Sequence, residues 1–521
     1  MTIEDQAEKG FLTDQDEESH VEAKADQQIA DALTEQPESA AVMSPAAGPP
    51  AEPTGPSEPS MPDLSVLDQR PSAGEPREYH FPAFERARLG NGMTVVQAHV
   101  PGRALLAAHL IFPGGGWTEP PDQRGVTVLT GRAMPEGTER RDAVEFIEAS
   151  ERLGADMHAD VSWEALSASM EVPRSRFGPA LALLAEMVSQ PAFPGAEVDR
   201  LREERMNDLL QAWSDPRRRA ERVFPETIYS PDVPYSRPLG GVQTTVGPLD
   251  RDAVAARHGQ LINASEATLV VAGDLAGVPL MDLAEEHLGH LDGRDRSTPV
   301  TQPADPTANS DGARVVLVDR PGAPQSELRI GHVGVPRKTP DFHAVSVLNA
   351  ILGGTFHSRL NRVIREEKGY SYGIHSSFEM RRHAGPFAVR CGVETAVTVP
   401  ALVETLRIVR GMTQAPPTDE EVSLARDYLV GVFPLRFETA SQVAGALTGL
   451  VVYELPDDEL DRYRPAVSAI NADAVLAAAQ RNIRSQDLSI VIVGDAKQVE
   501  APLRDAGLGE VVVVPADAAP E

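Results

Sequence analysis

The sequence is poor in cysteine, in positive charge and in aromatic residues. Cys391 is the only cysteine among 521 residues, so the chain can form neither an internal disulfide nor a cluster of thiolate metal ligands. Lys and Arg number 48 against 78 Asp and Glu, and the net charge of −30 disfavours an extended contact with nucleic-acid phosphates. A lone thiol fits a reducing compartment, and we expect a cytoplasmic protein with no nucleic-acid partner.

Long hydrophobic runs are also missing. No stretch approaches the roughly 20 apolar residues that span a bilayer. The first twenty residues, MTIEDQAEKGFLTDQDEESH, carry acids where a signal peptide carries bases. The sequence therefore predicts no membrane association.

The acidity is concentrated at the N-terminus. Residues 1–75 hold 17 acids and 3 bases, a net charge of −14, and are nearly free of aromatic side chains. Such a composition buries too little apolar surface to offset chain entropy, so we predict a disordered acidic Pro/Ala/Glu-rich tail over residues 1–78. A solvated linker is the preferred interpretation of this tail, and a partner-binding segment is the alternative.

Order is predicted to begin near His80. The segment RLGNGMTVVQAHV offers an Asn-Gly turn between apolar stretches, and ALLAAHLIF continues as a buried strand, so that together they resemble a hairpin. A flexible loop is expected over FPGGGWTEP, and apolar periodicity predicts the elements that follow. These are helices at about 123–134, 141–153, 175–190 and 195–222, and an alternating segment at 155–172.

A strand that runs into Gly-Asp occurs twice, in EATLVVAGDLAG and in QDLSIVIVGDAKQ, 221 positions apart. This internal repeat predicts an α+β fold with two homologous α/β repeats, each a mostly antiparallel sheet covered by helices. The predicted domains are 79–279 and 313–515, joined by a linker at 280–312 that lacks periodicity, and residues 516–521 form a C-terminal tail.

The stretch GGTFHSRLNRVIREEKGYSY, residues 353–372, is the most distinctive of the second repeat. A helix precedes it, the glycine pair interrupts that helix, and Thr355 or Ser358 can cap a second one. In this second helix Leu360 and its apolar neighbours are expected to face inward and Asn361 outward. Gly369 is a predicted stop signal, so that Arg365 and Tyr372 can project from a helix-to-strand junction into a common space.

The two-copy layout, the strand-Gly-Asp endings and the segment GGTFHSRLNRVIREEKGYSYGIHSSF resemble the pitrilysin/insulinase family of zinc peptidases, which includes the mitochondrial processing peptidases. The resemblance covers about residues 80–515. It implies that the two repeats form half of a clamshell chamber. In that family, an active zinc subunit carries His-x-x-Glu-His on a helix of the first repeat and a further Glu some 75 residues later.

This chain departs from the zinc pattern. The equivalent helix is GVTVLTGRAMPEGT, in which Val128, Gly131 and Arg132 stand at the His, Glu and His positions. Asp208 falls near the place of the distant carboxylate. No histidine occurs between positions 110 and 157, so the resemblance implies no zinc site in the first repeat and no metal ligands in this chain.

In the second repeats of this family, an Arg and a Tyr seven residues apart bind the substrate and are thought to stabilise the oxygen of the scissile carbonyl. Arg365 and Tyr372 match that spacing. A guanidinium and a phenol are suitable donors for such an oxygen. Arg365 has an alternative interpretation as a solvated cation in the last helical turn. Tyr372 has one as a half-buried strand aromatic, and Tyr370 is a rival that would face the same side of a strand.

The resemblance therefore implies a zinc-free subunit of a heteromeric insulinase-like metallopeptidase. This subunit would bind a peptide or unfolded polypeptide and would supply Arg365 and Tyr372 to the site of a homologous partner subunit, in which zinc is expected. The alternative is a non-enzymatic scaffold or peptide-binding module of the same fold. An autonomous metallopeptidase with an unrecognised site is a third, weaker hypothesis.

Other conspicuous residues have simpler interpretations. His287 and His290 lack further ligands nearby and are read as a solvated helix end. Gly114–Gly116 match neither a phosphate-binding nor a dinucleotide-binding motif and are read as a tight loop. Cys391 is predicted to be a structural residue of an alternating strand, and the basic residues of 358–365 to be solvated unless they line a substrate chamber.

Overall fold

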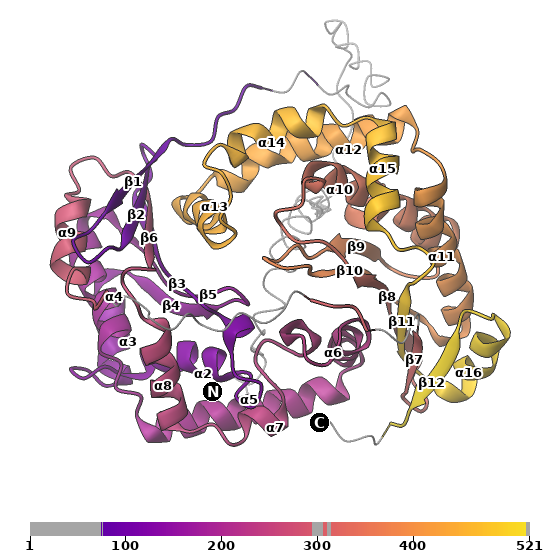
Figure 1. Cartoon of the computed structure of the whole chain (residues 1–521), viewed down its shortest axis with the longest axis horizontal. Helices are drawn as coiled ribbons and strands as arrows, with labels where there is room; N and C mark the ends of the chain where they lie inside the picture. The colour runs from indigo at the N-terminus through magenta and orange to yellow at the C-terminus, as the bar shows by residue number, and fades with distance from the viewer. Residues whose placement is uncertain (1–73, 75–76, 294–305, 310–313, 517–521) are drawn as a thin grey trace, which may run out of the picture. The chain divides into compact units, whose positions relative to one another are not determined.

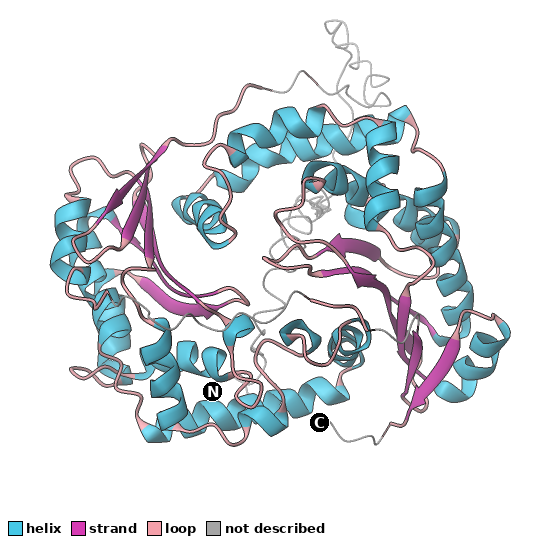
Figure 2. Cartoon of the chain, in the orientation of Figure 1, coloured by secondary structure: helices cyan, strands magenta, loops and turns pink. Residues whose placement is uncertain are grey.

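Each half of the described part of the chain is built on a six-stranded sheet (Figures 1 and 2). The computed structural model describes residues 74, 77–293, 306–309 and 314–516; nearly all of the predicted tail, much of the predicted linker and most of the C-terminal tail lie outside the described residues. The first sheet has the order β1-β2-β6-β3-β5-β4 and the second β12-β7-β11-β8-β10-β9. The strands are β1 Phe84–Arg88, β2 Thr94–His99, β3 Leu105–Pro113, β4 Asp156–Val161, β5 Ala165–Pro173, β6 Thr268–Gly273, β7 Arg314–Asp319, β8 Gln325–Val333, β9 Ile374–Phe378, β10 Pro386–Glu394, β11 Ser489–Gly494 and β12 Glu510–Val514.

Helices accompany both sheets. In the first half they are α2 Val126–Ala133, α3 Ala143–Leu153, α4 Phe177–Ser189, α5 Gly195–Ser214, α6 Pro216–Ile228, α7 Gln243–Val246, α8 Arg251–Leu261 and α9 Leu280–Leu288. In the second half they are α10 Phe342–Asn349, α11 Thr398–Gln414, α12 Asp419–Val432, α13 Ala440–Val452, α14 Glu459–Ser468, α15 Ala472–Asn482 and α16 Ala496–Asp505, with the π-helical turns η6 Ala350–Gly354 and η7 Asn361–Glu367. Short 3-10 turns are η2 Gly116–Thr118, η3 Met134–Glu136, η4 Arg174–Arg176, η5 Pro234–Ser236, η8 Thr395–Val397 and η9 Phe433–Phe437.

The two sheets confirm the predicted α+β class and the internal repeat. Strands β3 and β8 both have nine residues and start 220 positions apart, and β5 and β10 both have nine residues and start 221 apart. The sheets differ at one edge. In the first sheet the outermost strand is the N-terminal β1, antiparallel to β2, whereas in the second it is the C-terminal β12, parallel to β7. The first repeat therefore completes its sheet with the first described strand, and the second repeat with the last.

Local sequence explains several boundaries. The β1–β2 hairpin turns at Asn91-Gly92, where Gly92 has φ +92°, a conformation that favours glycine. Helix α3 begins with a capping box in which the Asp142 carboxylate accepts from the Glu145 amide at 2.8 Å. The predicted helix over 195–222 is two helices, because Pro216 cannot continue the hydrogen bonding of α5 and Asp215 caps α6.

Three expectations about the first half are corrected. Strand β3 pairs with β6 and β5 rather than with β2, so the predicted hairpin stops at β2. The segment 112–120, expected to be a flexible loop, contains the 3-10 turn η2, and its Trp117 is buried. The linker prediction also began too early, because residues 280–288 form α9, whose Leu280, Ala284 and Leu288 join the first core.

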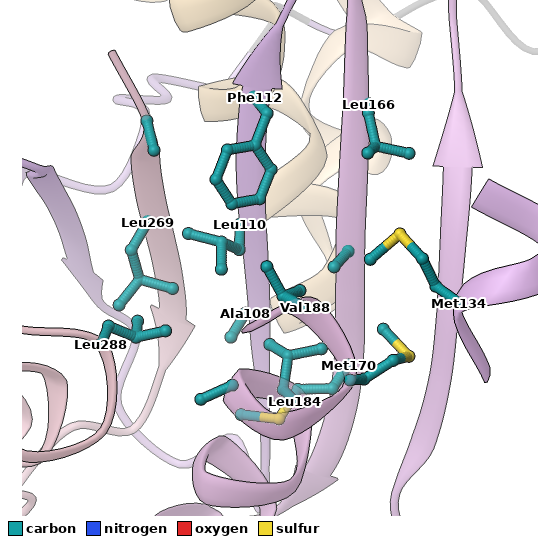
Figure 3. Packing of buried hydrophobic residues seen from close by; sticks show 14 of the residues in the cluster. Ala108, Leu110, Phe112, Met134, Leu166, Met170, Leu184, Val188, Leu269 and Leu288 are labelled. Atoms are coloured by element: carbon teal, nitrogen blue, oxygen red, sulfur yellow. The ribbon is translucent and has the colours of Figure 1, made fainter. Parts of the chain in front are cut away.

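The first core lies between the sheet and helices such as α4 (Figure 3). Alternate residues of β3 divide between the two faces of the sheet, as the period of a strand requires. Leu106, Ala108, Leu110 and Phe112 belong to this core, whereas Ala107 and Ile111 pack with α13 on the other face.

Helices α6 and α13 each pack on the sheet of the other half. Helix α6, from the first half, packs on β8 and β11 of the second sheet, and α13, from the second half, packs on β3 and β6 of the first. Phe224 and Ile228 of α6 meet Val318 and other valines of the second sheet, and Val443 and Leu447 of α13 meet residues such as Ile111. Each sheet therefore has its second face covered by a helix that the other half contributes.

Candidate functional site

Helix α2, which carries the three positions of the zinc motif, is held firmly at its start. The buried carboxylate of Glu119 accepts hydrogen bonds from the backbone amides of Gly125 at 2.8 Å and Thr127 at 2.7 Å. Burial raises the pKa of Glu119, although these bonds oppose the shift. Buried Arg257 of α8 donates to the Thr127 hydroxyl and to the carbonyl of Gly114. These hydrogen bonds fix the first turn of α2.

Gly131 stands where the family's catalytic Glu is expected, and a side chain at this position would require its neighbours to shift. A Cβ atom at Gly131 would lie 2.9 Å from Cγ2 of Val161 and 3.3 Å from Cδ1 of Leu166. Glycine lets α2 approach the β4–β5 end of the sheet closely, since a Cβ contact of 2.9 Å would force Val161 or the helix to move. The glycine that replaces the acid is therefore part of the close contact between helix and sheet.

Arg132 stands at the position of the second His and forms an ion pair instead of a metal bond. Its guanidinium donates to Glu204 of α5 at 2.9 Å, and Glu204 also pairs with Arg200. Asp208, predicted near the distant carboxylate, forms ion pairs with Arg205 and Arg218. The acids that face this region are neutralised by arginines of the chain, so the residues present do not fit a zinc ion.

Other residues with metal-ligand chemistry do not change this result. Within the described residues, no group of three or more His, Cys, Asp and Glu side chains could hold a metal ion. His287 lies in the last turn of α9 and His290 just beyond it. Cys391 is buried in the second core, and burial raises its pKa to about 12, as suits the predicted structural residue.

The stretch 353–372 begins with the last two residues of the π-helical turn η6 and contains the whole of the second one, η7. Gly353 allows η6 to pack against β9, because a Cβ there would lie 2.7 Å from the backbone nitrogen of Ser376. The Ser358 hydroxyl accepts from the Asn361 amide at 3.5 Å, which supports its predicted capping role. Gly369 ends the second turn with φ +63°, as predicted. Wide turns of this type are often found at functional sites.

Asn361 corrects one expectation and explains how the turn is fixed. It is buried rather than outward-facing, and its side chain bridges the carbonyl of Thr355 at 3.2 Å and the amide of Ile374 at 3.3 Å. The Ser371 hydroxyl lies 2.7 Å from the carbonyl oxygen of Gly373 and 2.8 Å from that of Gly392, and its single proton can be donated to either. The residues around Tyr372 are thereby tied to strands β9 and β10.

The structure separates the two candidate tyrosines. Neither lies on a strand, since β9 starts only at Ile374, so the expectation that both share one strand face is wrong. Tyr370 is half-buried against the second core, whereas the Tyr372 side chain is 94% exposed. Arg365 is also exposed, and its guanidinium lies 4.5 Å from the ring centre of Phe356. Arg365 and Tyr372 therefore both face solvent from one segment, and their assignment as site residues stays a prediction.

Two sheet edges are relevant to peptide binding. Strand β9, which directly follows Tyr372, forms one edge of the second sheet, and β4, which α2 contacts, forms one edge of the first. An edge strand has a row of backbone donors and acceptors on one side without a partner strand, and an extended peptide can pair with such a row.

A buried ion cluster between α6 and the second sheet was not foreseen. Arg329 of β8, only 1% exposed, donates to Glu221 of α6 at 2.6 Å, and Arg390 of β10 donates to the same carboxylate at 3.1 Å. Burial alone would raise the pKa of Glu221, but the two arginines lower it to about 2. Each arginine alternates with apolar residues in its strand, and this pattern was the sequence signal for a buried charge. The sequence did not indicate their common partner, which lies more than 100 residues earlier.

The chain has a two-repeat α+β fold, and its helix α2 carries no metal ligand at the three compared positions. These two features define its class, a two-repeat peptidase-like fold without the zinc motif. Residues 94–239 match the family model described as insulinase (peptidase family M16), and residues 248–429 match the model described as the peptidase M16 inactive domain. The chain belongs to the M16, or insulinase, family. The resemblance inferred from the sequence is confirmed.

Relatives within this family carry contrasting descriptions. The chain is 24% identical over 339 residues to a non-peptidase homolog, YmxG, of Helicobacter pylori, a match that covers 64% of this chain and 76% of the relative. It is 23% identical over 441 residues to an uncharacterized zinc protease of Streptomyces coelicolor, covering 82% of this chain and 94% of the relative.

Solved structures show the same fold. A peptidase M16 inactive domain from Pseudomonas fluorescens superposes with a TM-score of 0.73 at 24% identity, covering 79% of this chain and 98% of that one. A protease from Helicobacter pylori superposes with a TM-score of 0.75 at 18% identity, covering 80% of this chain and 100% of that one.

Among the described residues, no helix is long and apolar enough to cross a membrane.

Proposed function

We propose that this chain is the zinc-free subunit of a heteromeric insulinase-like peptidase. It binds an extended peptide and presents Arg365 and Tyr372 to the active site of a homologous subunit that carries the zinc ion. One observation carries the proposal: the metal positions on α2 hold Val128, Gly131 and Arg132, while Arg365 and Tyr372 are both exposed.

The chemistry assigned to the pair is electrostatic. Peptide hydrolysis places negative charge on the carbonyl oxygen, and preorganised donors that meet this charge lower the barrier. Arg365 supplies a permanent cation with a planar set of donors. Tyr372 supplies a single hydroxyl donor on a backbone that Ser371 and Asn361 hold in place.

Arg365→Ala tests the assignment in the mixed enzyme. We expect kcat for an unfolded peptide to fall about 10²–10³-fold, the usual cost of removing one such donor. The fold should be unaffected, since an exposed side chain contributes about 0.5 kcal/mol or less to stability. Arg362→Ala is the matched control, because Arg362 is exposed on the same turn and only approaches Glu367 at 3.9 Å. Normal turnover in Arg365→Ala would reject the role.

Two phenylalanine variants decide between the tyrosines. Tyr372→Phe removes a fully solvated hydroxyl, and we expect a lower kcat with unchanged thermal stability. Tyr370→Phe should leave kcat unchanged. The reverse pattern would transfer the role to Tyr370.

The alternative function is a peptide-binding module without a catalytic role. The contact of Arg365 with Phe356 favours it, because the guanidinium already has an aromatic partner within the chain. Under this alternative the chain binds a zinc subunit or a peptide with the same affinity before and after Arg365→Ala, and the partner's cleavage rate does not depend on the chain.

A further inference from the structure

Carboxylates are the partners of the other two arginines in the segment that carries Arg365. Arg359 donates two hydrogen bonds to the carboxylate of Glu421 of α12, both at 2.7 Å. Arg362 approaches the carboxylate of Glu367 at 3.9 Å. A carboxylate partner balances the charge of a guanidinium and accepts from its N–H donors. The charges of Arg359 and Arg362 are therefore balanced within the chain.

Arg365 differs from them because its partner is an aromatic ring. Its guanidinium carbon lies 4.5 Å from the ring centre of Phe356, within the range of a cation–π contact. Within the part of the chain that the structure describes, its side chain forms no hydrogen bond or ion pair. A ring carries no charge that would neutralise the guanidinium, and a guanidinium that stacks on it keeps its in-plane N–H donors. Arg365 is thus held by a partner that leaves it available as a donor.

The ring is itself fixed by the chain around it. Phe356 lies in the connection between η6 and η7, and this backbone is hydrogen-bonded on both sides of the ring. The Thr355 hydroxyl donates to a carbonyl of η6 at 3.1 Å, and the Ser358 amide donates to the carbonyl of Thr355 at 3.1 Å. The neighbouring ring of His357 packs edge to face with Phe356, at 5.3 Å between the ring centres. The backbone therefore sets the position of the ring independently of Arg365.

Packing in a core does not account for Phe356. Its side chain is 53% exposed, and among the described residues it joins none of the hydrophobic clusters of the second half. Arg365 is exposed as well, and its side chain has several rotatable bonds, so without a contact its guanidinium samples many positions. A donor that is already ordered before the reaction stabilises the transition state more than a donor that must first be ordered. The ring supplies this order.

We propose that Phe356 is a positioning residue for Arg365. Its ring holds the guanidinium where it meets the carbonyl oxygen of a substrate, and it leaves both the charge and the N–H donors in place. The inference rests on the proposed function, because a positioned guanidinium affects turnover only if Arg365 meets the substrate. The same contact favours the binding-module alternative, in which the ring merely occupies the guanidinium, and the kinetics of variants separate the two.

Nuclear magnetic resonance of the full chain, labelled with isotopic arginine, measures the contact directly. The Nε–Hε signal of Arg365, assigned by its loss in Arg365→Lys, should be displaced by the ring current of Phe356. In Phe356→Leu it should move to the range of solvated arginines. Phe84→Leu on β1 is the matched control, because it makes the same change beside another arginine, Arg86, and should leave the signal in place. A signal that is the same in the wild-type chain and in Phe356→Leu would overturn the proposal.

Turnover of the mixed enzyme shows whether the contact matters for catalysis. Phe356→Leu should lower kcat for an unfolded peptide about two- to fivefold, which corresponds to the strength of an exposed cation–π contact. KM should change less than kcat, and the melting temperature should not change. Phe356→Trp and Phe356→Tyr restore a ring and should keep the wild-type kcat. An equal loss in Phe356→Leu and Phe356→Tyr would overturn the proposal, because the ring would then not be the feature that matters.

The double variant separates this inference from the proposed function. If Phe356 acts through Arg365, adding Phe356→Leu to Arg365→Ala should cause no further loss of kcat. The same loss in both backgrounds, or no loss in Phe356→Leu beside a low kcat in Arg365→Ala, would overturn the positioning role and leave the role of Arg365 intact. Normal turnover in Arg365→Ala would reject the proposed function and the positioning role together.

Discussion

Glu221→Gln tests the ion cluster that joins α6 to the second sheet. The substitution keeps the size and hydrogen-bonding capacity of the side chain but removes the charge that Arg329 and Arg390 share. Arg329 is 1% exposed and keeps only Glu327 as a partner carboxylate, so its charge would remain buried with weaker compensation.

The size of the effect follows from burial. Breaking a fully buried pair costs about 3–5 kcal/mol, but the Glu221 side chain is 34% exposed, and solvent screens part of the interaction. We therefore expect a loss of about 2 kcal/mol, which is about a thirtyfold change in an equilibrium constant.

Hydrogen exchange followed by mass spectrometry measures this loss locally. Amides of α6, residues 216–228, should lose protection by about thirtyfold in Glu221→Gln. Glu148→Gln is the control, because the Glu148–Arg152 pair on α3 is exposed and should contribute about 0.5 kcal/mol or less. Protection of α6 within about threefold of this control would refute the reasoning.

The same cluster and two other sites give further predictions. The pKa of Glu221 is lowered from 4.5 to about 2, so its contribution to stability is complete above pH 4.5 and is lost as the pH falls towards 2. Hydrogen exchange of the α6 amides, measured over this pH range, should show the loss of protection. The same loss should be absent in Glu221→Gln. Gly131→Glu should lower the free energy of unfolding by about 3 kcal/mol, because it overpacks the contact and buries a charge. Gly431→Glu on α12 is the control, because a Cβ there meets open space. Circular dichroism should show a lower melting temperature for Gly131→Glu and an unchanged one for Gly431→Glu. Equal melting of both variants would contradict the packing argument for α2. Cys391 should resist iodoacetamide in the native chain and react after denaturation, because it is buried and its pKa is near 12; rapid native alkylation would contradict this.

Much of the fold could be predicted because the repeat and the periodicity are local signals. The strand ending in Gly-Asp occurs twice, 221 positions apart, and β5, β6, β10 and β11 lie where alternation or apolar runs predict strands. The order of strands could not be predicted in the same way. That β6 inserts between β2 and β3 depends on pairing across more than 150 residues, which no local pattern specifies.

The candidate site divides along the same line. The absence of metal ligands at Val128, Gly131 and Arg132 is visible in the sequence, but the close approach of Gly131 to Val161 is visible only in the structure. Asn361 was misplaced because a helix pattern alone does not reveal that its amide bridges two backbone segments. A groove lined by residues of β3, β4 and β5 could not be predicted either, because it needs α13 for one wall, and α13 follows β3 by more than 300 residues.

The proposed division of one active site between two subunits can be tested by titrating this chain into a zinc-bearing M16 subunit and following cleavage of an unfolded fluorogenic peptide. We expect that neither protein cleaves appreciably alone, and that activity rises with added chain until the two are equimolar. Activity of the partner that does not respond to this chain, or chelator-sensitive cleavage by this chain alone, would contradict it.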